Sequence, residues 1–259
     1  MKCSVVVLDL DGTLLNSSKQ VSNRNLAAVL SCYSLGMRII IATARPPRAV
    51  SWFLPRELIE ISSFVYYNGA QVVCEKSNIE VYESISQPIT SEILEYCLQQ
   101  DSQIELTMEF RDEWFSLREL DYSNMMNAKE NPIVKSIEEL KQYAATKILL
   151  SGFDQFQELY IKFGQQVNIL ITDNNQLIQI MPLNASKELA VTRLCNNYNI
   201  SMDSVIIFGD DHNDLGLFKT TGYSIAMGNA INELKEIADE VTDSNDQDGV
   251  AIILEKLYR

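Results

Sequence analysis

Short apolar runs alternate with helical patterns in the first third of the chain and again near its C-terminal end. The predicted strands cover residues 4–8, 38–42, 64–67, 204–208 and 223–226. The predicted helices cover residues 23–35, a segment ending at Leu58, residues 187–198, 230–238 and 249–257, and a short stretch after Asp214. Because this alternation is typical of βαβ units around a parallel sheet, both ends of the chain are expected to form one α/β domain.

The helix predicted over residues 23–35 has a start and a stop signal in the sequence. Ser22 is a possible N-cap and Gly36 is a possible helix end. The residues expected to form its apolar face are Leu26, Val29, Leu30 and Tyr33. We expect this face to cover the sheet.

The middle of the chain alternates apolar and polar residues, as half-exposed antiparallel strands do. The predicted strands cover residues 103–110, 114–117, 168–172 and 177–181, with a turn at 173–176. The predicted helices cover residues 90–99, 136–143 and 154–163, the second with a capping-box pattern at Ser136 and Glu139. We therefore predict a Rossmann-like parallel-sheet core, residues 1–82 and 185–259, interrupted by an inserted α+β domain, residues 83–184.

Composition excludes some classes of partner. The net charge of −14 and the isoelectric point near 4.5 argue against binding to nucleic acid or to an anionic membrane surface. The five scattered cysteines indicate reduced thiols and a cytoplasmic location rather than a disulfide framework. The N-terminal apolar run is too short for a signal peptide or a membrane span.

Acidic residues follow two of the predicted strands. Asp9 and Asp11 come directly after residues 4–8, and Asp210, Asp211 and Asp214 follow residues 204–208. Since ligands bind beyond the carboxyl ends of parallel strands, the two groups are expected to meet around a hard cation with oxygen ligands. The alternative is that these acids line solvated turns.

Groups suited to an anion occupy corresponding places. Thr43 and Ala44, at the end of the strand over residues 38–42, offer a hydroxyl and free backbone amides. Lys187 stands at the start of a predicted helix, where the helix dipole also favours an anion. Carboxylates, a cation, a hydroxyl, amides and a lysine together indicate a phosphate site.

These elements resemble, in chain order, the four motifs of the haloacid dehalogenase superfamily of phosphatases. Residues 9–13, Asp-Leu-Asp-Gly-Thr, resemble motif one and Thr43 resembles motif two. Lys187 resembles motif three and residues 209–214, Gly-Asp-Asp-His-Asn-Asp, resemble motif four. The insert is similar to the C2-type cap of the Cof-like branch, whose members are cytoplasmic phosphatases of sugar phosphates and related compounds. Ala44 stands where many relatives have glycine.

The resemblance implies a role for each of these residues. Asp9 would be the nucleophile, and Asp11 the general acid and then the base for water. The implied Mg²⁺ ligands are Asp9, Asp11 through its carbonyl, Asp210 and Asp214. The implied phosphate-binding groups are the amides of Leu10 and Ala44, Thr43, Lys187 and Asn213. The substrate would be a small phosphorylated metabolite.

Three functions remain open at this point: a phosphatase, a phosphomutase of the same fold, and a non-catalytic sensor of phosphorylated metabolites. Arg45 is expected either to reach the substrate or to be solvated or paired with a carboxylate. His212 is expected at the surface. Trp114 and Tyr122 either line a specificity pocket or belong to the core.

Overall fold

The computed structural model describes residues 3–122, 130–172 and 176–257. The chain divides into two compact units. The first comprises Met1–Val81 and Ser186–Arg259, and the second comprises Tyr82–Ala185. One continuous unit is thus inserted into another that both ends of the chain build.

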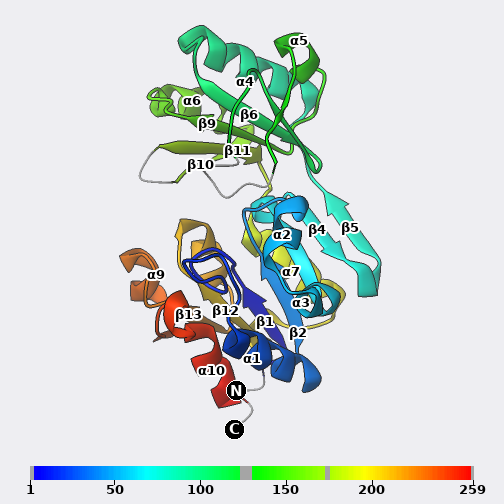
Figure 1. Ribbon diagram of the computed structural model, residues 1–259, viewed down its shortest axis with the longest axis vertical. Coiled ribbons are helices and arrows are strands. Elements are labelled where there is room, and N and C mark those ends of the chain that lie inside the picture. Colours follow the sequence, from blue (N-terminus) through cyan, green and yellow to red (C-terminus); the bar gives the residue numbers. More distant parts are fainter. Residues whose placement is uncertain (1–2, 123–129, 173–175, 258–259) are drawn as a thin grey trace. The chain divides into compact units, whose positions relative to one another are not determined.

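The first unit contains an eight-stranded sheet of order β14-β13-β12-β1-β2-β3-β4-β5 (Figure 1). Its strands are β1 (Val5–Leu8), β2 (Arg38–Ala42), β3 (Ser62–Tyr66), β4 (Gln71–Cys74), β5 (Ile79–Tyr82), β12 (Val205–Gly209), β13 (Tyr223–Ala226) and β14 (Glu240–Val241). Every pairing from β14 to β3 is parallel, and β4 is antiparallel to β3. The prediction of a parallel-sheet core is confirmed, whereas β4, β5 and β14 were not predicted.

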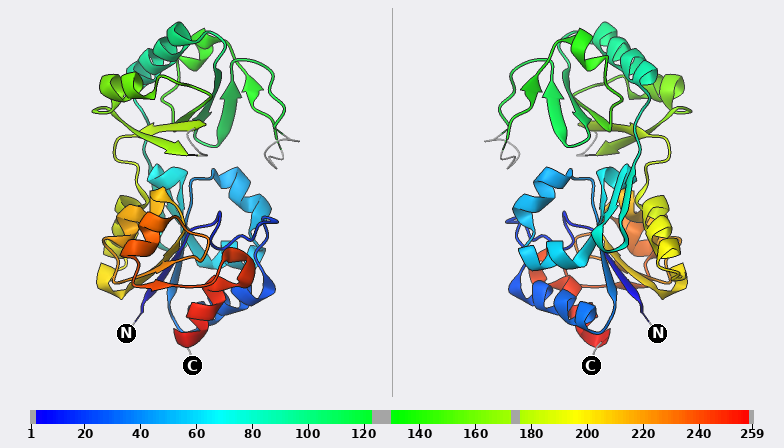
Figure 2. Two further views of the ribbon diagram at one scale, coloured as in Figure 1. Left: turned by 90° about the vertical axis from the view of Figure 1, so that its left-hand side faces the viewer. Right: turned by 90° about the vertical axis from the view of Figure 1, so that its right-hand side faces the viewer.

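Helices cover both faces of this sheet (Figure 2). They are α1 (Asn23–Ser34), α2 (Pro47–Phe53), α3 (Arg56–Ile61), α7 (Lys187–Asn197), α8 (Leu215–Phe218), α9 (Asn232–Ile237) and α10 (Gly249–Leu257). Helices α1, α3 and α10 pack together in one layer, and α7, α8 and α9 form the other. Because both faces are covered, the central strands are buried throughout, which explains their unbroken apolar sequences.

Helix α1 begins as predicted but buries a different face. The Ser22 side chain accepts a hydrogen bond from the Asn25 amide, and Gly36 has φ +90° just after the helix. The buried side chains are Asn25, Ala28, Val29 and Cys32, whereas Tyr33 is exposed. The predicted apolar face was therefore wrong in part, because Asn25 turns inward to accept a hydrogen bond from the first turn of α10, at the Ala251 amide.

The register of the central strands brings their carboxyl ends to one edge of the sheet. Strand β1 lies between β2 and β12, with Leu8 opposite Ile41 and Phe208. The Asp9 amide donates to the Phe208 carbonyl at 3.1 Å, so the pairing continues one residue beyond β1. Side chains that follow these three strands consequently start from neighbouring positions.

The second unit contains a six-stranded sheet of order β10-β11-β9-β6-β7-β8, antiparallel except for the β7–β8 pair. Its strands are β6 (Glu105–Phe110), β7 (Glu113–Ser116), β8 (Ile133–Val134), β9 (Lys147–Ser151), β10 (Val167–Thr172) and β11 (Leu177–Pro182). Its helices are α4 (Gln87–Gln100), α5 (Ile137–Leu140) and α6 (Phe156–Phe163). Side chains from α4 and α6, such as Ile93 and Phe163, form one apolar core with the strands.

Strand β9, at the centre of this sheet, was not predicted, because its sequence is a plain apolar run without alternation. The capping box of Ser136 and Glu139 is present, but the helix that it starts, α5, is shorter than expected. The predicted turn at 173–176 falls largely outside the described residues.

Candidate active site

Three carboxylates converge at the carboxyl edge of the first sheet. Asp9 follows β1, and Asp210 and Asp214 follow β12. One carboxylate oxygen from each lies within 4.8 Å of the others. Asp9 is 5% exposed and Asp214 is fully buried. The expectation that acids distant in sequence meet at this edge is thus met by these three side chains.

Lys187 supplies the positive charge in this cluster. It is the first residue of α7, whose N-cap Ser186 accepts a hydrogen bond from the Leu189 amide. The Lys187 Nζ lies 2.5 Å from Asp9 Oδ1 and 2.8 Å from Asp214 Oδ1, and its side chain is completely buried. One ammonium therefore faces three carboxylates, which leaves the cluster with an excess negative charge.

The pKa values of the cluster reflect first its burial and then the excess of carboxylates. Burial raises the pKa of Asp9 well above its ordinary value, against the charge of Lys187. Burial and then the charge of Asp214 raise the pKa of Asp210 to about 7. Burial alone would lower the pKa of Lys187, but the carboxylates of Asp214 and Asp9 raise it instead, so the amine stays charged. A divalent cation would offset the carboxylate repulsion that remains, and these oxygen donors suit one.

Two glycines make the convergence possible. Gly12 has φ +80°, and a Cβ there would come 2.1 Å from Asp210 Oδ2. A Cβ at Gly209 would come 2.6 Å from the Asp214 carboxylate. Thr13, next to the first glycine, donates from its hydroxyl to Asp210 Oδ1 at 2.9 Å. The loop after β1 therefore lies directly against the Asp210 side chain and fixes its position.

The Asp11 carboxylate is absent from the three-carboxylate cluster. It accepts hydrogen bonds from Arg45 Nε at 2.5 Å, from Arg45 Nη2 at 2.7 Å and from Lys19 Nζ at 2.6 Å. The Arg45 guanidinium also lies over the Phe53 ring, 4.5 Å from its centroid. Burial would raise the pKa of Asp11, but the hydrogen bonds and charges of Arg45 and Lys19 together lower it. Of the alternatives expected for Arg45, the structure shows the carboxylate-paired one.

The other residues that the sequence singled out lie around the same edge. Thr43 is buried just after β2, and its hydroxyl accepts from the Arg45 amide at 3.1 Å. Asn213 donates from its side-chain amide to Asn68 Oδ1 at 2.9 Å. The Asn68 backbone amide in turn donates to the Thr43 backbone carbonyl at 2.9 Å. Leu10, directly after Asp9, is fully buried.

Sequence reasoning assigned no role to Thr13, Lys19 or Asn68. Thr13 and Asn68 stand in the segments that follow β1 and β3, so the rule that located Asp9 would also have flagged them. Lys19 has φ +57° in a loop and carries no local signal that it returns to Asp11.

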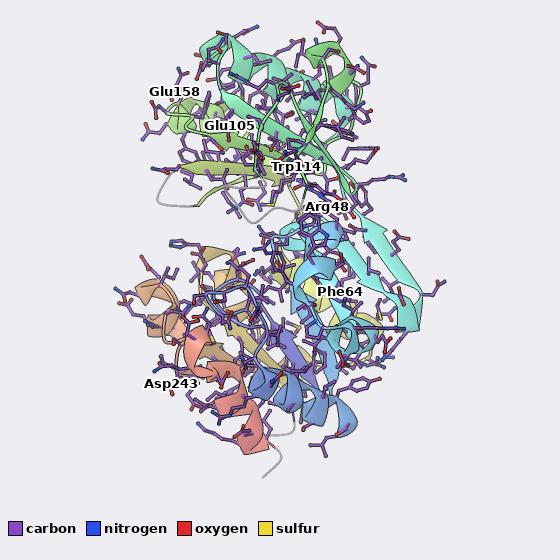
Figure 3. The ribbon with its side chains drawn as sticks, viewed as in Figure 1. Arg48, Phe64, Glu105, Trp114, Glu158 and Asp243 are labelled. Atoms are coloured by element: carbon purple, nitrogen blue, oxygen red, sulfur yellow. The ribbon has the colours of Figure 1, made fainter. Side chains whose placement is uncertain are left out.

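Two further expectations concern side chains outside this cluster. His212 is exposed, as predicted. In the second unit, Trp114 and Tyr122 stack with ring centroids 5.1 Å apart, and Tyr122 donates from its hydroxyl to Glu105 at 2.5 Å. Figure 3 labels Trp114 and Glu105 on the sheet of that unit. Tyr122 is 7% exposed, which favours the core interpretation for this residue.

Comparisons with known proteins agree with this geometry. The sequence pattern of the haloacid dehalogenase-like hydrolases matches residues 6–254. A 5-amino-6-(5-phospho-D-ribitylamino)uracil phosphatase of Bacillus subtilis, YwtE, is 28% identical over 99% of this chain and 98% of its own. Phosphatase YwpJ of the same organism is 28% identical over 98% of this chain and 99% of its own. A haloacid dehalogenase-like hydrolase from Bacteroides thetaiotaomicron has a similar structure, with a TM-score of 0.86, 28% identity and coverage of 99% and 100%. Among the described residues, no helix is long and apolar enough to cross a membrane.

Proposed function

The chain belongs to the haloacid dehalogenase-like hydrolases and is of their phosphatase type, and we propose that it is a Mg²⁺-dependent phosphatase of small phosphorylated metabolites that works through an aspartyl-phosphate on Asp9. The observation that carries this proposal is the convergence of the Asp9, Asp210 and Asp214 carboxylates, two of which are paired with the buried Lys187. We also propose that residues 1–82 and 185–259 act as the catalytic core and residues 83–184 as the cap.

Mg²⁺ would be held by the carboxylates of Asp9, Asp210 and Asp214 and by the carbonyl of Asp11. When bound, it would neutralise charge on the phosphoryl group, which is the main requirement of phosphoryl transfer. The raised pKa values of Asp9 and Asp210 are consistent with this assignment, because burial first and the neighbouring carboxylates second disfavour the ionised forms, and the charge of Lys187 does not offset both.

In the first step, an Asp9 carboxylate oxygen attacks phosphorus, and the bond from phosphorus to the ester oxygen breaks. Asp11 gives its proton to the leaving alcohol. In the second step, Asp11 takes a proton from water, whose oxygen attacks phosphorus, and phosphate leaves as Asp9 is regenerated. Lys187 donates a hydrogen bond to Asp9 Oδ1, and its charge lowers the repulsion between the nucleophile and the anionic substrate in both steps.

The surroundings of Asp11 suit the second step better than the first. Its pairs with Arg45 and Lys19 hold the carboxylate in the ionised form, which accepts a proton. To donate a proton, Asp11 must loosen at least one of these pairs. We propose that an arriving phosphoryl group, being an anion, competes with Asp11 for Arg45.

The phosphoryl oxygens would be bound by the amides of Leu10 and Ala44, the Thr43 hydroxyl, Lys187 and Asn213. Asn68 supports this assignment because it connects the Asn213 side chain to the Thr43 carbonyl. Asn68 therefore links Asn213, which follows β12, to Thr43, which follows β2.

For the substrate, we propose a sugar or polyol phosphate. The relatives named as 5-amino-6-(5-phospho-D-ribitylamino)uracil phosphatases support this class, since three of them are 24–28% identical to this chain over nearly their whole length. The phosphorylated ribityl compound is consequently the first substrate to test.

The test is phosphate release from a panel of phosphorylated sugars, polyols, nucleotides and cofactors, with Mg²⁺ or with EDTA. We expect metal-dependent release that Asp9→Asn abolishes. His212 is exposed. The variant His212→Gln is therefore the matched control and should retain activity. A phosphomutase would instead convert substrate without net release and depend on a bisphosphate, and a sensor would bind without turnover. Either result would contradict the proposal.

A further inference from the structure

A cavity of about 410 Å³ lies at the edge of the first sheet where β2 and β3 begin. Its lining includes Tyr33 near the end of α1, Arg38 at the start of β2, Ser63 in β3 and Cys74 at the end of β4. At about 3.3 Å per residue, β2 separates Arg38 from Thr43 by roughly 16 Å. The cavity is therefore distinct from the acidic site at the opposite edge of the same sheet.

Two cations flank the cavity. Arg38 lies over the Tyr198 ring, 4.1 Å from its centroid, and Lys76 lies over the Tyr33 ring at 4.5 Å. Lys76 also donates to the Tyr33 hydroxyl at 2.5 Å. Within residues 3–122, 130–172 and 176–257, neither cation forms a salt bridge with a carboxylate. In a chain of net charge −14, such a pair favours an anionic ligand here.

A thiol lies against this cavity at the end of a hydrogen-bond chain. The Tyr198 hydroxyl donates to Cys74 Sγ at 3.4 Å and lies 2.6 Å from the Ser63 hydroxyl. A hydroxyl has one proton, so when Tyr198 donates to sulfur, Ser63 must donate to Tyr198. The sulfur then accepts from a chain of two hydroxyls, an arrangement that favours the thiolate.

The five cysteines differ in the direction in which their surroundings change the thiol pKa. Burial would raise the pKa of Cys74, but hydrogen bonds to its sulfur from neighbouring groups, the Tyr198 hydroxyl among them, outweigh burial and lower that pKa. Burial raises the pKa of the four other thiols, Cys3, Cys32, Cys97 and Cys195. Since the thiolate is the nucleophilic form, Cys74 combines the favoured ionisation with a neighbouring cavity.

We propose that this cavity is a second binding site, which takes a small disulfide bearing carboxylates, and that Cys74 is modified there by thiol–disulfide exchange. The Cys74 thiolate attacks one sulfur of the bound disulfide, whose S–S bond breaks. A new S–S bond forms to Cys74, and the other half leaves as a thiolate, so no separate oxidant is required. The carboxylate of the half that stays pairs with Arg38 and Lys76. Cys74 is only 2% exposed, so the cavity selects what reaches it.

The test compares three small disulfides of similar size and different charge: dithiodiglycolate, hydroxyethyl disulfide and cystamine. Intact-mass measurement and peptide mapping give the rate and site of adduct formation on the folded protein. We expect modification of Cys74 in the order anionic, neutral, cationic, with about a tenfold range at low salt. The range should shrink near 1 M salt, where the screening length is about 3 Å.

Variants separate the parts of the proposal. Arg38→Gln and Lys76→Gln should reduce the preference for the anionic disulfide while leaving Cys74 reactive. Tyr198→Phe should slow all three reagents equally, because it removes the donor to sulfur. Cys3→Ser is the matched control and should change nothing. The unaltered protein alone can refute the proposal: no adduct on Cys74, equal reaction at Cys3, or no dependence on reagent charge would each overturn it, whatever the phosphatase assay shows.

Discussion

Replacing Asp210 by asparagine should stabilise the metal-free protein and at the same time remove its response to Mg²⁺. The side chain keeps nearly the same shape, and an amide oxygen can still accept the Thr13 hydrogen bond. The change removes one of three carboxylates that lie within 4.8 Å of one another. Function and stability are therefore expected to oppose each other at this residue.

The magnitude follows from the pKa of Asp210, which is raised from 3.8 to about 7. In the unfolded chain the carboxyl group ionises near 3.8, so between the two values the folded state holds the extra proton and stability falls as pH rises. The destabilisation by ionised Asp210 is absent below about pH 4 and complete above about pH 7. There the pKa shift of Asp210 corresponds to at most about 4 kcal/mol of unfolding free energy. Because solvent reaches part of Asp210, we expect the variant to gain about 2 kcal/mol at pH 8 and less than half of that at pH 5.

The assay is urea unfolding at pH 5 and pH 8, in EDTA and in Mg²⁺. The parent protein should gain about 2.7 kcal/mol when Mg²⁺ is present at a hundred times its dissociation constant, and Asp210→Asn should gain nothing. Asp154→Asn removes an exposed charge elsewhere and is the matched control. If Asp210→Asn is less stable than the parent in EDTA at pH 8, or if its effect does not depend on pH, the electrostatic reasoning fails.

Three further predictions concern other parts of the first unit. Lys187→Met should destabilise the protein by about 3–5 kcal/mol in urea unfolding, because it leaves Asp9 buried without its cation; an unchanged unfolding free energy would contradict the pairing. Arg45→Gln should raise the pKa of Asp11, so that the basic limb of the kcat/KM profile moves to higher pH; a limb that stays in place would argue against Asp11 as the proton donor. Ser22→Ala should cost about 1 kcal/mol of stability through loss of the helix cap, with unfolding in the presence of Mg²⁺ as the readout, and a neutral result would show that the cap contributes little.

The sequence was sufficient to locate the acidic cluster. Asp9 and Asp210 each follow an apolar run that reads as a buried strand, and parallel strands end at a common edge. The position of a residue relative to the end of its strand is a local property, which explains why it can be read from the chain. Lys187 at a helix start is local in the same way.

The tertiary structure decided which partner each of these side chains has. From the sequence, Arg45 could reach the substrate, be solvated or pair with a carboxylate, and the register of β1 beside β2 brings it to Asp11. Lys19 reaches the same carboxylate through a loop whose path has no sequence signal.

The sequence by itself thus determined the strand ends, the residue types at them and the order of the motifs. Hydrophobic periodicity and the residues that end helices and strands are properties of short segments, so they can be identified without the fold. It did not determine strand β9, whose apolar run fits a strand or a buried helix equally well until the neighbouring strands β6 and β11 are in place. Nor did it reveal the hydroxyl chain at Cys74, which joins residues from β3, β4 and the end of α7. Partners and pKa values depend on distances of a few ångströms between segments far apart in the chain, and only the packed fold fixes those distances.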